Sequence, residues 1–192
     1  MPELLTPQER ETLLSLARQS IQIATQGEPL PALNLESFSP RLQEWGVTFV
    51  TLTEAGELRG CVGALEAYQP LVEDAREHAV AAALNDYRFT PVRSDEVERL
   101  HIEISRLTQP VPLEYADAND LLEKLHPGQD GVLIRSGAFA RATFLPQVWE
   151  KLSDPAEFMT HLCLKMGSSG NLWRRQRLSV FTYQVEMFEE EK

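Results

Sequence analysis

Two β-hairpins separated by helical segments define the kind of fold that this sequence can adopt. Residues 47–53 are rich in β-branched side chains, residues 54–57 form a turn, and residues 58–65 return as a second strand. A second hairpin is formed by residues 131–135 and 138–145. Because hairpins join antiparallel strands, we expect an α+β fold with a mainly antiparallel sheet and packed helices.

Capping residues mark where the helices begin. Thr6 is expected at an N-cap, with Pro7 at N1 and Glu9 at N3, and the apolar stripe that follows ends at Gly27. Three further helices are predicted, each beginning at a proline or an acidic cap: Pro70, Asp117 and Asp154.

The chain is predicted to be a single domain over residues 1–192. The alternating residues 101–106 and the β-rich residues 179–185 add two strands to the hairpins. Residues 28–39 contain two prolines and form an irregular connector, which is a candidate lobe boundary. The acidic tail, residues 189–191, is predicted to be a solvated end.

Composition and charge exclude several classes of function. The net charge is −11, from 29 acidic and 18 basic residues, so the overall field repels the phosphates of DNA and RNA. Apolar runs such as residues 80–84 are too short to cross a bilayer, and the first residues lack the regions of a signal peptide. Cys61 and Cys163 form no CxxC pattern and are expected to be free thiols in a reducing cytoplasm.

A glycine-rich strand with the sequence LRGCVG, residues 58–63, is the most informative segment for function. Gly60 and Gly63 weaken a strand interior, so a close backbone contact or a ligand against the strand is expected. Alternation places Arg59 and Cys61 on one face, about 7 Å apart along the chain. A guanidinium near a thiol favours the thiolate, which makes Cys61 a candidate nucleophile. A buried structural cysteine beside tightly packed glycines explains the same residues.

The same segment resembles the six-residue motif of the AMMECR-one domain family. Further segments agree with this family in order and spacing: DYRFTPV at residues 86–92, IEIS at 102–105, GVLI at 131–134, ATFLPQVW at 142–149 and the closing strand. The resemblance covers nearly the whole chain. Tyr87 stands where family members often carry proline, so the backbone between Asp86 and Arg88 could be presented differently here.

The resemblance implies an α+β fold with a larger and a smaller lobe, and a site near the glycine-cysteine strand. Bacterial and archaeal members are similar to the A component of the AmmeMemoRadiSam system, which is encoded beside a Memo-like protein and a radical SAM enzyme. These two proteins are therefore implied as functional partners. The resemblance implies no reaction, because the biochemical activity of the family is not settled.

Other polar residues could complete a site around the thiol. Glu103 shares a strand face with His101 and Ser105 and is a candidate base, or this face is simply exposed to solvent. Asp86 and Arg88 follow the alanine-rich helix and could anchor a polar substrate or form a structural ion pair.

Arg141 and Thr143 lie on one face of their strand and are further candidates for substrate binding, with simple exposure as the alternative. No metal and no cofactor is expected. The sequence has no phosphate loop and no GxGxxG motif. No HExxH motif or paired-ligand spacing is present among the four histidines, His78, His101, His126 and His161.

Two kinds of function remain open. The first is an enzyme, or a substrate-handling component of a pathway, with Cys61 and Glu103 as catalytic residues. Its substrate would contact the following residues: Arg59, Gly60, Gly63, Asp86, Arg88, Arg141 and Thr143. The second is a non-catalytic module whose groove binds a protein or a peptide.

Overall fold

The computed structural model describes residues 4–191, and the chain divides into two compact units. The larger unit comprises Met1–Leu107 and Glu186–Lys192, and the smaller one comprises Thr108–Val185. The connector at residues 28–39 lies inside the larger unit, and the chain leaves this unit after Leu107. None of the helices in the described range is long and apolar enough to cross a membrane.

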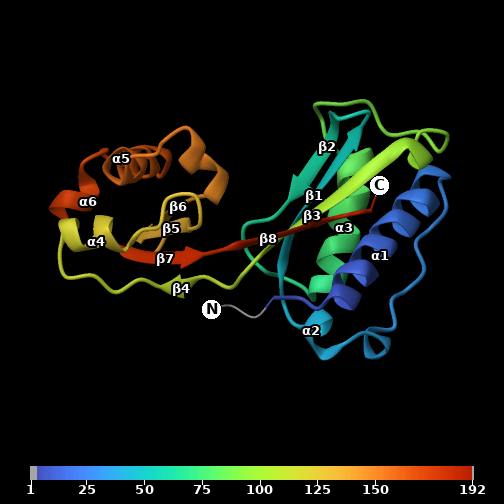
Figure 1. Cartoon of the computed structure of the whole chain (residues 1–192), viewed down its shortest axis with the longest axis horizontal. Helices are drawn as coiled ribbons and strands as arrows, with labels where there is room; N and C mark the ends of the chain where they lie inside the picture. The colour runs from blue at the N-terminus through green and yellow to red at the C-terminus, as the bar shows by residue number, and fades with distance from the viewer. Residues whose placement is uncertain (1–3, 192) are drawn as a thin grey trace. The chain divides into compact units, whose positions relative to one another are not determined.

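The first unit is built on a four-stranded sheet with the order β2-β1-β3-β8 (Figure 1). The strands are β1 (Val47–Glu54), β2 (Glu57–Gly63), β3 (Leu100–Leu107) and β8 (Val185–Glu189). β1 pairs antiparallel with both β2 and β3. The predicted hairpin and the predicted strand near residues 101–106 are therefore confirmed, and β2 lies at an edge of the sheet.

Helices α1 (Pro7–Thr25) and α3 (Leu71–Leu84) cover one face of this sheet, and the short α2 (Pro40–Gln43) contacts α3 (Figure 1). The capping box at the start of α1 is confirmed. The Thr6 hydroxyl accepts a hydrogen bond from the Glu9 amide at 3.3 Å, and the Glu9 carboxylate accepts one from the Thr6 amide at 2.8 Å.

The two faces of this sheet differ in character because side chains alternate along each strand. Val50, Leu52, Ile102 and Ile104 are fully buried and pack with the apolar sides of the two long helices. The residues that alternate with them lie on the opposite face, hereafter the outer face: Phe49, Thr51, His101, Glu103 and Ser105. The outer face is thus the polar side of the sheet.

The second unit holds another four-stranded sheet, with the order β4-β7-β5-β6. Its strands are β4 (Val111–Pro112), β5 (Gly131–Ser136), β6 (Ala140–Phe144) and β7 (Ser179–Tyr183), and all the pairs are antiparallel. Helices α4 (Ala118–Lys124), α5 (Pro155–Lys165) and α6 (Leu172–Arg175) belong to this unit. Asp117 and Asp154 cap α4 and α5 as predicted. Both sheets confirm the α+β class.

The acidic tail differs in part from the prediction of a solvated end. Residues up to Glu189 belong to β8, and the Glu190 carboxylate accepts a hydrogen bond from Arg18 on α1 at 2.6 Å. Glu189 lies 2.9 Å from a ring nitrogen of His101. The prediction holds for Glu189 and Glu191, which are exposed, and is wrong for Glu190. It treated the glutamates as a charged run, whereas the Glu189 and Glu190 carboxylates each have a specific partner in the fold.

Candidate functional site

Cys61, Thr51 and Glu103 form one row across three strands of the outer face. Thr51 on β1 is the register partner of Cys61 on β2 and also of Glu103 on β3. Directly facing residues on neighbouring strands project to the same side, and neighbouring strands lie about 4.8 Å apart. The Cys61 and Glu103 side chains therefore leave the sheet about 10 Å apart, with Thr51 between them.

The Cys61 thiol is half-buried, and among residues 4–191 one hydrogen-bond donor lies beside it. The Thr51 hydroxyl donates to Sγ at 3.3 Å. A donor at this position stabilises negative charge on sulfur. Cys163, in the second unit, is fully buried on α5, and burial raises the pKa of its thiol. The two cysteines thus lie in contrasting surroundings.

Glu103 is half-buried, and no hydrogen bond reaches its carboxylate from any residue in the range 4–191. Desolvation raises its pKa, the charge of Glu189 raises it further, and His101 lowers it. His101 itself directs a ring nitrogen to Glu189. A half-buried carboxylate without a donor can take up a proton or bind a donor from a ligand.

Asp86 and Arg88 bind the backbone of Cys61 on the edge of β2. The Cys61 amide donates to Asp86 Oδ2 at 2.9 Å, and Arg88 Nη2 donates to the Cys61 carbonyl at 3.1 Å. Arg88 also donates to both Asp86 oxygens, at 2.9 and 2.6 Å. The two side chains therefore satisfy the groups that an edge strand would otherwise leave open at Cys61.

The same contacts fix the charge state of this pair. Asp86 is 7% exposed, and the hydrogen bonds from the Arg88 side chain, with those from the backbone amides of Cys61 and Arg88, hold its pKa well below the usual range. The pKa of Arg88 is raised, first by Asp86 and also by the nearby Cys61 thiol. The pair is a closed ion pair beside the thiol, and it holds the backbone of Cys61 in place.

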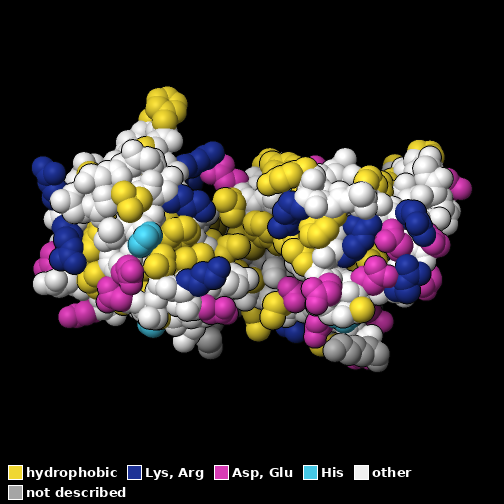
Figure 2. Space-filling view, turned by 90° about the horizontal axis from the view of Figure 1, so that it is seen from above, with side chains coloured by type: hydrophobic (Ala, Val, Ile, Leu, Met, Phe, Trp, Pro, Cys, Tyr) yellow, Lys and Arg dark blue, Asp and Glu magenta, His cyan; other side chains and the backbone are white. Residues whose placement is uncertain are grey.

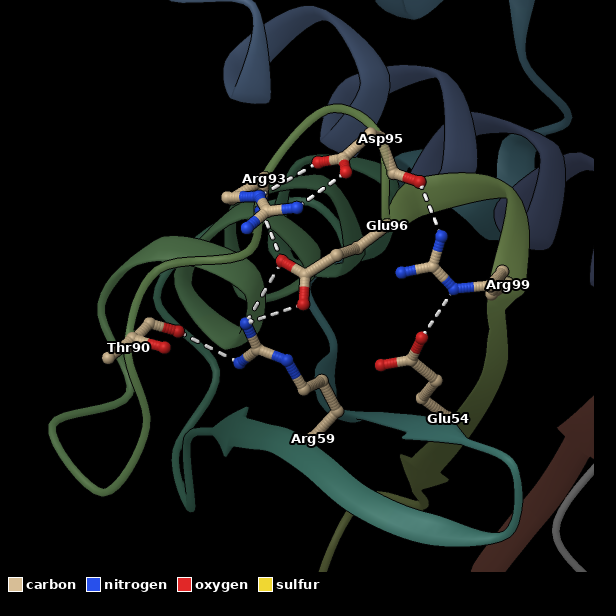
Figure 3. Close-up of polar contacts among 7 residues, drawn as sticks. All are labelled: Glu54, Arg59, Thr90, Arg93, Asp95, Glu96 and Arg99. Carbon is tan, nitrogen blue, oxygen red and sulfur yellow. Dashed lines mark hydrogen bonds and ion pairs between the residues drawn. The ribbon is translucent and has the colours of Figure 1, made fainter.

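Arg59 departs from the alternation that the sequence suggests. Leu52 pairs with Gly60 whereas Thr53 pairs with Leu58, so Arg59 is the extra residue of a β-bulge. Its guanidinium donates to the Thr90 carbonyl at 2.8 Å and to Glu96 at 3.2 Å (Figure 3). The bulge therefore directs Arg59 to the loop before β3. The guanidinium that binds Cys61 is that of Arg88, which donates to the Cys61 carbonyl.

Packing accounts for both glycines of β2. A Cβ on Gly60 would lie 2.1 Å from the backbone oxygen of Ala82 on α3. A Cβ on Gly63 would lie 2.4 Å from the ring of Phe49 and 2.5 Å from the Thr48 oxygen. Of the explanations that the sequence left open, a close approach by another backbone therefore applies at Gly60, and no ligand is needed to explain the two glycines.

Arg141 and Thr143 belong to β6 of the second unit. Thr143 is buried, its hydroxyl donates to the Val132 carbonyl at 2.9 Å, and it lies 2.8 Å from the Tyr183 hydroxyl. Arg141 is exposed and faces Arg135 across the hairpin. Thr143 is therefore already satisfied within its own unit.

Thr51 is the residue that sequence reasoning missed, and its only signal is the pairing register of the hairpin. Across residues 4–191, His, Cys, Asp and Glu side chains form no group of three or more that could hold a metal ion. The row of Cys61, Thr51 and Glu103 brings together a thiol, a hydroxyl and a carboxylate.

Comparison with known proteins identifies relatives of nearly full length. The AMMECR1 family model matches residues 14–188. Protein MK0488 of Methanopyrus kandleri is 38% identical, with 100% of this chain and 93% of that protein covered. Protein MJ0810 of Methanocaldococcus jannaschii is 34% identical, with 97% and 92% covered. The crystal structure of the uncharacterized protein PH0010 from Pyrococcus horikoshii has a TM-score of 0.77 and 31% identity, and covers 97% of this chain and 94% of that one.

Proposed function

From the row on the outer face we propose that this chain, which belongs to the AMMECR1 family, is a substrate-handling protein whose chemistry is centred on the Cys61 thiol. The observation that supports this most directly is the row on the outer face. The Thr51 hydroxyl donates to the sulfur, and the Glu103 carboxylate has no donor from the described residues. A nucleophile, a group that stabilises its charge and a base thus share one face.

The reaction class that suits these groups is addition of the thiol to an electrophilic carbon. In such a step the sulfur forms a bond to a carbonyl carbon, and the electron pair of the carbonyl π bond moves to oxygen. The thiol proton passes to Glu103, through a water that spans the remaining gap, and then to the oxygen. The product is a covalent thiohemiacetal, and its formation needs no oxidant.

Asp86 and Arg88 act as positioning residues in this proposal. They bind the amide and the carbonyl of Cys61, so they fix the backbone from which the thiol projects. A strand edge that is held at both of these groups keeps the distance to Thr51 constant. Because the Asp86 and Arg88 side chains are hydrogen-bonded to each other, the substrate contacts Cys61 and Glu103 in this proposal.

The same proposal assigns functional partners. We propose that the protein acts in one pathway with a Memo-like protein and a radical SAM enzyme, the partners implied by the resemblance of its sequence to the A component of the AmmeMemoRadiSam system. Deleting its gene should change the metabolite profile in the same way as deleting either partner gene. Unrelated profiles would refute the shared pathway without affecting the chemistry at Cys61.

The direct test of the chemistry is the labelling rate of Cys61 in the folded protein. Thr51→Val removes the hydroxyl and keeps the shape, so alkylation by iodoacetamide should slow several-fold. Thr53→Val is the matched control, because Thr53 lies on the same strand but pairs with Leu58. Thr51→Ser should restore the rate. Equal rates in all four proteins would refute the role of this row.

The second candidate function, a protein- or peptide-binding module, is favoured by one observation. The glycines of β2 are explained by packing against Ala82 and Phe49, so they do not themselves require a small ligand. In a cell that needs this protein, Cys61→Ser separates the two functions. Full activity of this variant would establish the binding module and refute the thiol-centred function.

A further inference from the structure

The net charge of the protein lies entirely in the unit that carries Cys61. Residues 108–185 contain eight acidic and eight basic side chains, so the whole charge of −11 belongs to the first unit. Residues 1–107 contain no lysine at all. The field around this unit therefore attracts cations and repels anions.

The arginines of the first unit are already bound to oxygen atoms. Figure 2 shows dark blue cationic side chains beside magenta carboxylates on this part of the surface. Eight of the nine lie against a carboxylate and the other against a backbone carbonyl: Arg10 and Arg106 with Glu186, Arg18 with Glu190, Arg41 with Glu44, Arg59 with Glu96, Arg88 with Asp86, Arg93 with Asp95, Arg99 with Glu54, and Arg76 with the Pro31 carbonyl. A phosphate or carboxylate ligand would have to compete with these partners.

Arg88 is the guanidinium bound to the Cys61 carbonyl, and a carboxylate held by two hydrogen bonds offsets its charge. Asp86 accepts two hydrogen bonds from its side chain, at 2.9 and 2.6 Å. Such a bidentate pair presents little net charge to a ligand beside the thiol. An anionic substrate would therefore gain little from Arg88.

Glu103 has the opposite character. Its carboxylate receives no hydrogen bond from the described residues, and Glu189 lies close enough to raise its pKa. The one nearby imidazole, His101, is hydrogen-bonded to Glu189. The outer face thus offers a ligand, in the row of Cys61, a carboxylate that receives no hydrogen bond from the described residues.

We infer that the substrate taken at Cys61 is a small molecule with a cationic amine, which binds one oxygen of the Glu103 carboxylate, leaves the other oxygen to take the thiol proton, and turns its reactive carbon to the thiol. This inference rests on the proposed function and adds the class of substrate to it. The same charges disfavour phosphorylated and carboxylate metabolites at this site. The row that contains Cys61 and Glu103 therefore prefers cationic ligands to anionic ones.

Three thiol reagents with the same leaving group test this charge preference. They are the neutral methyl methanethiosulfonate, its trimethylammonium-ethyl analogue and its sulfonato-ethyl analogue. Labelling of Cys61 is followed by mass spectrometry, and each rate is divided by the rate with free mercaptoethanol. The cation should then react about tenfold faster than the anion, and high salt should reduce this ratio.

Glu103→Gln should lower the cation-to-anion ratio several-fold. Glu98→Gln is the control, because Glu98 is exposed, is bound by Gln22 and lies outside the row. If the neutral reagent labels Cys61 but the ratio equals that of mercaptoethanol, the amine class is refuted and the proposed function stands. If the neutral reagent fails to label Cys61, both fail. An unchanged ratio in Glu103→Gln also overturns the role of Glu103 in selecting the substrate.

Discussion

The backbone amide of Cys61 donates a hydrogen bond to Oδ2 of Asp86 at 2.9 Å. This bond joins the edge of β2 to the loop that follows α3. A second bond to the same residue comes from Arg88, which donates to the Cys61 carbonyl. At Cys61, side chains therefore occupy the edge of β2 where a further strand would otherwise pair.

Replacing Asp86 should destabilise the fold. Asp86→Ala removes the acceptor of the Cys61 amide and leaves Arg88 without its carboxylate, so the free energy of unfolding should fall by about 1.5–3 kcal/mol. Asp95→Ala, which removes an exposed ion pair with Arg93, should have only a small effect. Urea denaturation measures both.

The contribution of Asp86 also has a definite pH dependence. Since its pKa is lowered in the folded protein, its stabilisation is present above the ordinary value of about 3.9 and is lost as the pH falls through the lowered value. The stability difference between wild type and Asp86→Ala should therefore shrink under strongly acidic conditions. A constant difference at all pH values would show that Asp86 contributes through packing alone.

Gly60→Ala should destabilise the protein through overpacking. The added Cβ would lie 2.1 Å from the Ala82 oxygen, so α3 or β2 must move, at a cost of about 1–3 kcal/mol or more. Gly56→Ala is the comparison, because its Cβ meets open space and only the positive φ opposes it. Thermal denaturation should rank Gly60→Ala as the less stable variant, and the reverse order would contradict the close approach.

Glu103→Gln should stabilise the protein at neutral pH. The folded-state pKa of Glu103 is raised, so wild type is favoured at low pH and loses stability as the pH rises through that value. Glutamine has no charge to desolvate. The gain should be present at pH 7 and vanish well below the ordinary glutamate pKa of about 4.3. A variant that is less stable at both pH values would show that Glu103 has a structural partner.

Glu186→Ala should be among the more damaging substitutions. This 6% exposed carboxylate accepts hydrogen bonds from the Leu5 amide and from Arg10 and Arg106, all at 3.0 Å. Breaking such a buried network typically costs about 3–5 kcal/mol. Met187→Ala, at the exposed neighbouring position, should be close to neutral. Chemical denaturation measures both variants. Equal free energies of unfolding would contradict the predicted role of Glu186.

Local signals in the sequence identified the longer helices and the two hairpins, but not the short elements α2, α6 and β4. The capping box at Thr6 and the acidic caps at Asp117 and Asp154 mark helix starts, since such side chains bind the first free amides of a helix. The division into two sheets, and the strand β8 beyond Val185, depend on contacts between distant residues. Periodicity within a short window contains no information on such contacts.

The candidate site was only partly predictable for a similar reason. The motif around Cys61 identified the strand, but an uninterrupted hairpin from the turn at Ala55-Gly56 would place Thr51 opposite Gly60. The bulge at Arg59 shifts the register by one residue and brings Thr51 opposite Cys61. The same bulge turns Arg59 away from the position that simple alternation predicts. No residue type in the strand indicates that a bulge occurs there.

The most direct test of the thiol-centred function is alkylation of the native protein, with mass spectrometry to locate the label. Cys61 is half-buried beside the Thr51 hydroxyl, whereas Cys163 is fully buried and its pKa is raised. Iodoacetamide should therefore modify Cys61 in the folded protein, and Cys163 only after unfolding. If Cys61 reacts as slowly as Cys163 in the native protein, the thiol is structural and the proposed function is wrong.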